Sequence, residues 1–421
     1  MIVLKRIEDK VDAFTGSTQA GYKHGRSCGE LVWAERMLIS VVTRKHFQYH
    51  KMGIDMSRAF DTIKRQTILD LLVKAGCTDD DLRLVRLLLT NTMLKVRVEG
   101  ELSTVFESLL GSFQGDSLSG KLFTLVLAGA LIELRHRLEE SPPHIPNPPI
   151  SKEGMPLESA YSDDCNFMNV EKESLEAILP IAKEVFKEFN LFINTEKTEF
   201  THVFLAPVGE TIPGRDDTML RGNEDWRKSK ILGSLLCSES DIAARCIAGN
   251  NAFYKFTKIW SQQNISVTRK IAVYEAQIVS IIMYNCSSWC PTAKSLEKLD
   301  ICHRKHLRSL LNIYWPHGTI SNANLYLRCN SVKLSDRVPK ARWKLLGHIL
   351  RSADDSPAAL ALKFAVTTNC KGRVGAHRKN LFKIIVNDLT RRGLKLNSLN
   401  DLNKLKILAD DRVAWRNKFL L

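Results

Sequence analysis

Two short stretches of this chain place aspartates within apolar sequence, and they constrain the fold more than any other feature. The stretch Ile54–Asp61 contains Asp55 and follows an apolar lead-in, and the stretch Ala160–Phe167 contains Asp163 and Asp164. Burying carboxylates together is costly, because desolvation and like charges both disfavour the ionised forms. A divalent cation is the usual remedy, so the pattern predicts a metal-binding acidic site. The alternative is a solvated turn, which we expect for the other aspartate runs at 79–81, 216–217, 354–355 and 410–411.

Further motifs stand around these stretches in a fixed order. They are Gln19-Ala20-Gly21-Tyr22-Lys23-His24-Gly25-Arg26-Ser27, Asp55-x-x-x-x-Phe60-Asp61, Gln114-Gly115-Asp116-Ser117-Leu118-Ser119, Tyr161-x-Asp163-Asp164, Leu191–Thr198 and Lys230-Ile231-Leu232-Gly233. The set resembles the reverse transcriptase of non-LTR (LINE-type) retrotransposons. Each match alone is weak, but the complete set in this order is specific.

The resemblance implies an α+β fold of the right-hand polymerase type. Partial fingers and a palm, with an antiparallel sheet flanked by helices, are expected over residues 1–235. A helical thumb is expected over 236–315, and a small, mainly helical, basic C-terminal module over 316–421. The resemblance implies an earlier fingers segment before the part where Met1 falls, and intact relatives also carry an endonuclease domain that we do not find in this sequence. We therefore expect an N-terminally truncated copy with poor turnover.

The resemblance assigns the chemistry to the acidic residues. Asp55, Asp163 and Asp164 are implied as catalytic residues and as ligands of two Mg²⁺ ions, with Mn²⁺ as an alternative. Such metals hold the attacking and leaving oxygens while a primer 3′-hydroxyl attacks a nucleotide. Asp61 is expected to be a helix cap or a surface contact. Phe60 is implied to fill the space of a ribose 2′-hydroxyl and so favour deoxynucleotides, the alternative being a core phenylalanine behind a strand.

Other site residues also take their roles from the resemblance. Gln114 and Gly115 are implied to contact the incoming nucleotide, since glycine lets the backbone approach closely. Lys197 is implied as a proton donor or charge partner for departing pyrophosphate; the alternative is a solvated lysine at a helix end. Leu232 and Gly233 are implied as the turn that steadies the primer end.

The positive charge is concentrated in the last part of the chain. Residues 301–421 hold 24 Lys and Arg against 7 Asp and Glu, a net of +17, whereas residues 1–300 hold 37 against 39. This asymmetry predicts that the tail attracts phosphate backbones. With the resemblance, the expected partners are an RNA template, a DNA primer or target, and deoxynucleoside triphosphates. We expect Trp343 and Trp415 in this tail to be core anchors and not base-stacking platforms.

Hydrophobic periodicity predicts most of the secondary structure. Helices are predicted over 28–45, 66–75, 81–90, 117–138, 175–189, 242–262, 268–284, 295–312 and 337–351. A strand is predicted at 52–56, a hairpin turning at Gly100, and a hairpin over 159–168 with Asp163 and Asp164 at its tip. Two edge strands are predicted at 191–193 and 199–205. The proline-rich stretch 141–149 reads as an inserted surface loop.

The remaining features exclude some classes. No secretory signal or membrane-spanning apolar run is visible, and ten cysteines without a dense framework fit a reduced protein of the nucleus and cytoplasm. Cys286, Cys290, Cys302 and His306 have a zinc-like spacing. The helical periodicity of 295–312 favours core positions instead.

The reading that these features favour is an RNA-directed DNA polymerase of a non-LTR retrotransposon. The alternatives are a catalytically inactive nucleic-acid-binding remnant, an RNA-dependent RNA polymerase and a group II intron maturase. The segments Arg342–His348 and Asp411–Arg416 resemble LINE-type tails more than maturase tails. The oligomeric state is not predicted.

Overall fold

The computed structural model describes residues 2–45, 49–113, 115–142, 144–145, 149–203, 226, 229–314, 316, 318–368 and 380–420. The chain divides into two compact units. Unit 1 comprises Met1–Leu31, His46–Thr218 and Ala353–Phe364. Unit 2 comprises Val32–Lys45, Met219–Ser352 and Ala365–Leu421.

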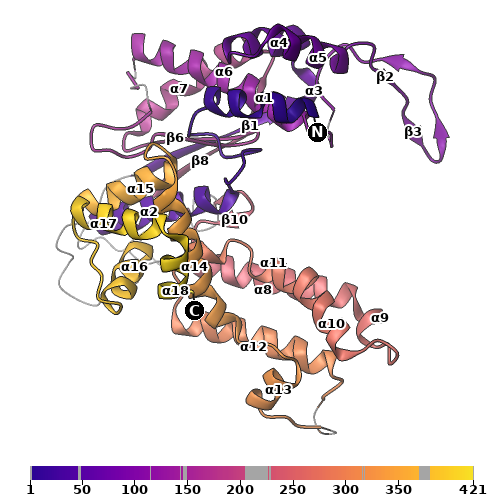
Figure 1. Ribbon diagram of the computed structural model, residues 1–421, viewed down its shortest axis with the longest axis vertical. Coiled ribbons are helices and arrows are strands. Elements are labelled where there is room, and N and C mark those ends of the chain that lie inside the picture. The colour runs from indigo at the N-terminus through magenta and orange to yellow at the C-terminus, as the bar shows by residue number, and fades with distance from the viewer. Residues whose placement is uncertain are drawn as a thin grey trace. The chain divides into compact units, whose positions relative to one another are not determined.

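Unit 1 is built on a four-stranded antiparallel sheet (Figure 1). Its order is β6 (Glu158–Tyr161), β7 (Asp164–Asn169), β1 (Tyr49–Ser57) and β8 (Phe192–Val203). The helix α7 (Lys172–Glu188) packs against β1, β7 and β8. The expected α+β fold with an antiparallel sheet flanked by helices is therefore confirmed.

The sequence of β1 explains why the sheet has one apolar and one polar face. Met52, Ile54 and Met56 are buried, and because side chains alternate along a strand they share one face. The intervening positions, which include Gly53 and Asp55, share the opposite face. A strand of this pattern places the Asp55 carboxylate on the face opposite to Met52, Ile54 and Met56, near the end of the strand where that face becomes partly exposed.

The other helices of unit 1 pack mostly against one another. They are α1 (Ile2–Phe14), the first residues of α2 (Cys28–Lys45), α3 (Ala59–Thr62), α4 (Arg65–Lys74), α5 (Asp79–Leu89) and α6 (Ser119–Glu140). The helix α5 begins with a capping box, in which Thr78 accepts from the Asp81 backbone and Asp81 accepts from the Thr78 backbone. After α5 the chain forms a long hairpin, β2 (Met93–Leu94) with β5 (Phe106–Glu107) and β3 (Arg97–Val98) with β4 (Glu101–Leu102), which projects from the helices (Figure 1).

Unit 2 is mostly helical. After the small hairpin β9 (Lys230–Ile231) and β10 (Ser234–Leu235) come α8 (Ser238–Lys255), α9 (Thr257–Trp260), α10 (Val267–Tyr274), the π-helix η2 (Glu275–Val279), α11 (Ser280–Ile282), the 3₁₀ turn η3 (Cys286–Ser288) and α12 (Ala293–Leu310). Then follow α13 (Asn322–Arg328), α14 (Leu334–Arg351), α15 (Pro357–Thr367), which begins in unit 1, α16 (Leu381–Thr390), α17 (Leu399–Asp410) and α18 (Arg412–Phe419). Trp343 on α14 and Trp415 on α18 are buried, which confirms both as core residues.

Several predicted elements differ from the structure in their boundaries or continuity. The two edge strands predicted at 191–193 and 199–205 are one element, because β8 runs continuously over Phe192–Val203 at the edge of the sheet, and residues 204–205 lie outside the described residues. The helix predicted over 268–284 is interrupted by η2, and that over 242–262 breaks between α8 and α9. Only Ser162 and Asp163 form the tip of the β6–β7 hairpin, since Asp164 already belongs to β7.

Some expectations are not tested by this structure. Gln114 and the basic loop 371–379 lie outside the described residues, and the predicted domain boundaries at 235 and 315 stay a prediction. Within the described part of the chain, no helix has both the length and the apolar character required to cross a membrane.

Candidate active site

The hairpin β6–β7 and strand β1 bring two of the predicted acidic residues to neighbouring positions in the sheet. Ile54 pairs with Cys165 across the β1–β7 ladder, so Asp55 and Asp164 are the next residues in the same antiparallel register. Directly opposite residues in such a ladder have Cα atoms about 4.5 to 5.5 Å apart. Asp163 precedes Asp164 in the turn that joins β6 to β7. Asp55, Asp163 and Asp164 therefore gather at one end of the sheet.

The electrostatics of Asp164 reflect this gathering. Burial raises the pKa of the Asp164 carboxyl above its ordinary value, and the negative charges of Asp163 and Asp55 raise it further. The ammonium of Lys51 opposes this shift but does not cancel it. The site thus holds more negative charge than its own cations neutralise.

Lys197 is the residue that approaches Asp55 most directly. Opposite β1, Asn194 of β8 pairs with Asp55, and Glu199 pairs with Gly53, so the intervening residues 195–198 form a bulge. This bulge carries Lys197, whose Nζ lies 3.5 Å from Asp55 Oδ2. The Lys197 side chain is 69% exposed and that of Asp55 36%, so solvent screens the pair. Lys197 lies in a strand and not at the helix end that was the alternative.

The donor chemistry suits a hard divalent cation, since all three predicted ligands are carboxylates. Among the residues that the structure describes, however, no three His, Cys, Asp or Glu side chains are grouped closely enough to hold a metal ion. The ammonium of Lys197 supplies positive charge to Asp55 in this arrangement. The fit to a metal therefore rests on the carboxylate set and its excess negative charge.

Lys51 is a site neighbour that the sequence analysis missed. It stands on β1, is 3% exposed, and its Nζ makes no hydrogen bond in the described part of the protein. A buried ammonium without a partner is costly, which marks the position as unusual. The available signal was a lysine directly before the apolar lead-in to Asp55.

Phe60 belongs to an aromatic cluster beside the site. Its ring stacks on Phe123 of α6 at a centroid distance of 4.5 Å and meets the ring of Tyr22 edge-on at 6.3 Å. Gly120 makes this possible, because a Cβ there would lie 2.4 Å from the Tyr22 ring. Phe60 is half-buried, so it is held by the core yet reaches the surface. Asp61 is exposed within α3.

Gly115 is the described member of the predicted nucleotide-contacting pair. Its φ of +94° lies in the region that favours glycine, and, apart from its chain neighbours, no atom of the described residues lies within 4 Å of the position of a Cβ. The backbone at this position is therefore open on its Cβ side.

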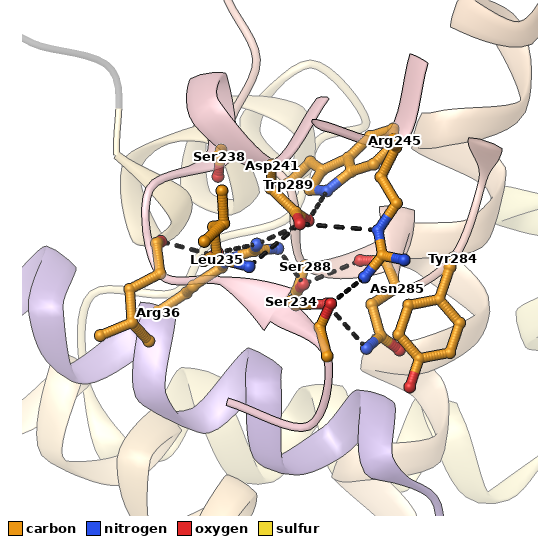
Figure 2. Close-up of polar contacts among 12 residues, drawn as sticks. Arg36, Ser234, Leu235, Ser238, Asp241, Arg245, Tyr284, Asn285, Ser288 and Trp289 are labelled. Carbon is orange, nitrogen blue, oxygen red and sulfur yellow. Dashed lines mark hydrogen bonds and ion pairs between the residues drawn. The ribbon is translucent and has the colours of Figure 1, made fainter. Parts of the chain in front are cut away.

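Leu232 and Gly233 form the turn between β9 and β10 in unit 2, where Figure 2 shows the surrounding polar contacts. Both residues have positive φ, 47° and 73°. The hydroxyl of Tyr284 donates to the Leu232 carbonyl at 3.0 Å, and the Arg245 guanidinium donates to the Gly233 carbonyl. The Arg245 guanidinium also lies 4.4 Å above the Tyr284 ring. Two side chains that the sequence analysis did not single out thus hold this turn.

Asp241 accepts the hydrogen bonds that hold the strand following that turn (Figure 2). It is 1% exposed, and its Oδ2 accepts from Arg36 Nη2 at 2.9 Å and from Trp289 Nε1 at 2.8 Å. Its Oδ1 accepts from the Leu235 backbone at 3.0 Å and lies 3.6 Å from Arg245 Nε. One buried carboxylate therefore connects β10 to helices α2 and α8.

Two of the four residues with zinc-like spacing, Cys302 and His306, have other partners. His306 contacts Tyr274 Oη through Nδ1 at 3.2 Å and Asn250 Oδ1 through Nε2 at 2.8 Å. Cys302 donates to the same Asn250 oxygen at 3.4 Å, and His303 Nδ1 lies 2.8 Å from the Tyr274 hydroxyl. Burial lowers the pKa of both His303 and His306 to about 4. These side chains form a buried hydrogen-bonded network.

Comparison with known families decides what the acidic site belongs to. Residues 1–237, more than half of the chain, match the model described as reverse transcriptase (RNA-dependent DNA polymerase). This chain belongs to the reverse transcriptase family. The matched range contains Asp55, Asp163 and Asp164 and extends past the Leu232–Gly233 turn. Enzymes of this family generally use divalent metals, and the carboxylate cluster agrees in its donor type.

Individual proteins that resemble this reverse transcriptase share a quarter or less of its aligned residues. It is 25% identical over 358 residues to the retrovirus-related Pol polyprotein from the type-1 retrotransposable element R2 of Bradysia coprophila, which supports the expected non-LTR kinship. The match covers 79% of this chain and 38% of that polyprotein, so the chain spans about two fifths of this relative. Among solved structures, telomerase from Candida albicans with a fragment of telomeric RNA is 10% identical, at a TM-score of 0.41 over 79% of this chain and 56% of that one. Apo telomerase from Candida tropicalis is 12% identical, at a TM-score of 0.39 over 99% of this chain and 61% of that one.

Proposed function

We propose that this chain is an RNA-directed DNA polymerase of a non-LTR retrotransposon, which adds deoxynucleotides to a DNA primer on an RNA template. The observation that carries the proposal is the gathering of Asp55, Asp163 and Asp164 at one end of the sheet, where burial and then the two acidic neighbours raise the pKa of Asp164. Family membership supplies the reaction class. The expected site of action is the nucleus and cytoplasm.

The three carboxylates are the proposed ligands of two Mg²⁺ ions, with Mn²⁺ as an alternative. When bound, such ions neutralise phosphate charge and stabilise the attacking and leaving oxygens of the displacement. Excess negative charge in the cluster favours their binding. Lys197, exposed and held to Asp55 by a screened ion pair, can release that carboxylate and pair with departing pyrophosphate.

The neighbouring residues would position the substrates. Phe60, fixed by its stacking on Phe123, is the proposed barrier to a ribose 2′-hydroxyl. The open backbone at Gly115 allows close approach of a nucleotide, with Gln114 beside it in the sequence. The Leu232–Gly233 turn is the proposed rest for the primer end. Positioning of this kind accounts for much of the rate enhancement in phosphoryl transfer.

The basic last third of the chain is the proposed binding surface for nucleic-acid backbones. Residues 301–421 hold 24 Lys and Arg against 7 Asp and Glu. An attraction of this type weakens as salt rises, because bound counterions are released on binding. We propose fingers and palm over residues 1–235, thumb over 236–315 and a basic module over 316–421.

Primer extension tests the function. The purified chain is given an RNA template, an annealed DNA primer, deoxynucleotides and Mg²⁺, and the rate is compared with that of Asp163→Asn and Asp164→Asn. Each substitution should lower the rate by about 100-fold or more, the scale for removing one preorganised charged group. Asp79→Asn is the matched control, since Asp79 is an exposed aspartate at the start of α5. Wild-type synthesis no faster than Asp163→Asn, with template–primer binding retained, would favour the non-catalytic remnant.

Sugar selection tests the role of Phe60. Phe60→Val should admit ribonucleotides, because it removes the ring that stacks on Phe123 and leaves a smaller side chain at this position of α3. The measurement is the ratio of deoxynucleotide to ribonucleotide incorporation on the same template. A wild-type preference for ribonucleotides would identify an RNA polymerase, and an unchanged ratio in the variant would remove Phe60 from the selection.

A further inference from the structure

The motif that begins at Gln19 contacts the acidic turn directly. The segment around Gln19 lies beside β6, where the Ala20 backbone donates to the Ala160 carbonyl at 2.9 Å and Ala160 donates to the Thr18 carbonyl at 3.0 Å. Gln19 itself forms a parallel bridge with Ala160. This bridge brings the Gln19 side chain close to the residues that directly precede the Asp163-Asp164 doublet.

The Gln19 amide pairs with both backbone groups of a single residue, Ser162. Its Oε1 accepts from the Ser162 N–H at 3.0 Å, and its Nε2 donates to the Ser162 carbonyl at 3.2 Å. Oε1 also accepts from the Gly21 N–H at 2.7 Å. Two N–H donors converge on the same atom, so that atom must be the amide oxygen. Gln19 is 1% exposed, which removes competition from water.

Ser162 needs such support. It is buried, and its φ of 57° lies in the left-handed region, which is unfavourable for a residue with a Cβ. Gly21 completes the arrangement, because a Cβ on it would lie 2.3 Å from the Ser162 nitrogen. The conformation of Ser162 sets the direction in which the chain enters Asp163 and Asp164.

We propose that Gln19 is a positioning residue, whose amide holds Ser162 in its left-handed conformation and thereby aims the carboxylates of Asp163 and Asp164. The inference rests on the proposed polymerase function for its catalytic consequence, but its structural part does not. A primary amide is suited to this task because it accepts and donates at the same time. A buried side chain that supports reacting groups in this way typically changes activity by about 10- to 100-fold when removed.

The test uses Gln19→Met, which keeps the length of the side chain and removes its hydrogen bonds, and Gln19→Glu, which keeps the acceptors. On an RNA template with a DNA primer, Gln19→Met should lower kcat by about 10- to 100-fold. The KM for the nucleotide and the affinity for template–primer should change by less than about twofold, since neither contact is altered. Amide hydrogen exchange should rise in the peptide 159–165 and stay unchanged in α6.

Gln19→Glu adds a pH signature. The introduced carboxyl can reproduce the donor only when it is protonated, so activity relative to wild type should rise as the pH is lowered. Thr78→Val is the stability control, because it removes the α5 capping box in the same unit without touching the turn. It should leave kcat unchanged.

The outcomes separate the two proposals. Wild-type kcat together with unchanged exchange at 159–165 in Gln19→Met would overturn the positioning role. Thr78→Val shows how exchange changes when unit 1 is destabilised away from the turn. If Gln19→Met raises exchange throughout unit 1 in the same way, Gln19 contributes to stability in general and the positioning role is overturned. Locally faster exchange in a protein whose wild-type form synthesises no DNA would support the positioning role and reject the polymerase function.

Discussion

Replacing Asp241 by asparagine should destabilise unit 2 strongly. Asp241 and Arg36 are 1% and 4% exposed, and their charges are 2.9 Å apart. The substitution keeps the shape but leaves the Arg36 guanidinium buried without a counterion. Burial already lowers the pKa of Arg36 despite the attraction of Asp241, so its desolvation is substantial. Removing one partner of a buried pair costs about 3 to 5 kcal/mol.

The hydrogen bonds of Asp241 point to the same magnitude. Oδ2 accepts from Arg36 and Trp289, and Oδ1 accepts from Leu235. Whichever way the asparagine amide is turned, its NH₂ group faces at least one N–H donor, which is left unsatisfied. Each lost hydrogen bond to a charged group contributes about 1.5 to 3 kcal/mol. The two estimates meet at a loss of about 3 kcal/mol.

Tryptophan fluorescence during urea unfolding is the suitable assay. All seven tryptophans of the chain lie within the ranges of unit 2, so their emission follows that unit alone. With a slope of about 2 to 3 kcal/mol per molar urea, Asp241→Asn should lower the midpoint by about 1 to 2 M. Glu297→Gln is the matched control: Glu297 is 60% exposed in its ion pair with Arg304, and this change should cost less than about 1 kcal/mol. Equal midpoints for the two variants would refute the reasoning.

Two further predictions concern the same unit. His303 and His306 have pKa values of about 4, below the ordinary 6.5, so the unfolded chain binds protons more readily and stability should fall as the pH drops from about 6.5 to about 4. The loss at pH 5 should be about 2 kcal/mol per histidine, and His306→Gln should remove one share of the pH dependence of the urea midpoint. Gly347→Ala should lower the free energy of unfolding by about 1 to 3 kcal/mol, because the added Cβ would lie 2.4 Å from Trp415 Nε1. Gly318→Ala, whose nearest contact would be an ordinary 3.6 Å, should have little effect.

Much of unit 1 could be predicted because local pattern and tertiary packing agree. The alternation along β1 determines which face Asp55 occupies, and the Asp163-Asp164 doublet lies where the predicted hairpin over 159–168 turns. The polar run at 194–198 predicts an interruption within β8 that the structure does not have. There Asn194 Oδ1 accepts from the backbone N–H groups of Glu196 and Lys197. This side chain supplies the hydrogen bonds that the neighbouring strand does not make in the bulge, and the strand continues beyond it.

The contacts of Gln19, Arg245 and Tyr284 could not be predicted in the same way. Each acts on a backbone group that is 12 to 143 residues distant in the sequence, through a turn with positive φ. Local periodicity carries no information on such pairs, because side-chain spacing within an element does not determine which turn meets it. The Gln19 motif gave the resemblance but not the contact.

Asp241 and Asp164 show how a structural and a functional carboxylate differ in one chain. Asp241 is surrounded by the donors that it needs: a guanidinium, an indole N–H and a backbone N–H. Asp164 instead lies near Asp163 and Asp55, and its pKa is raised because burial and its neighbours both oppose its charge. A fold retains a cluster of this kind at a cost in stability, which a binding cation would offset. Uncompensated negative charge that could bind a cation is therefore found at the acidic end of the sheet. The carboxylate of Asp241 in unit 2 is instead satisfied by its own hydrogen-bond donors.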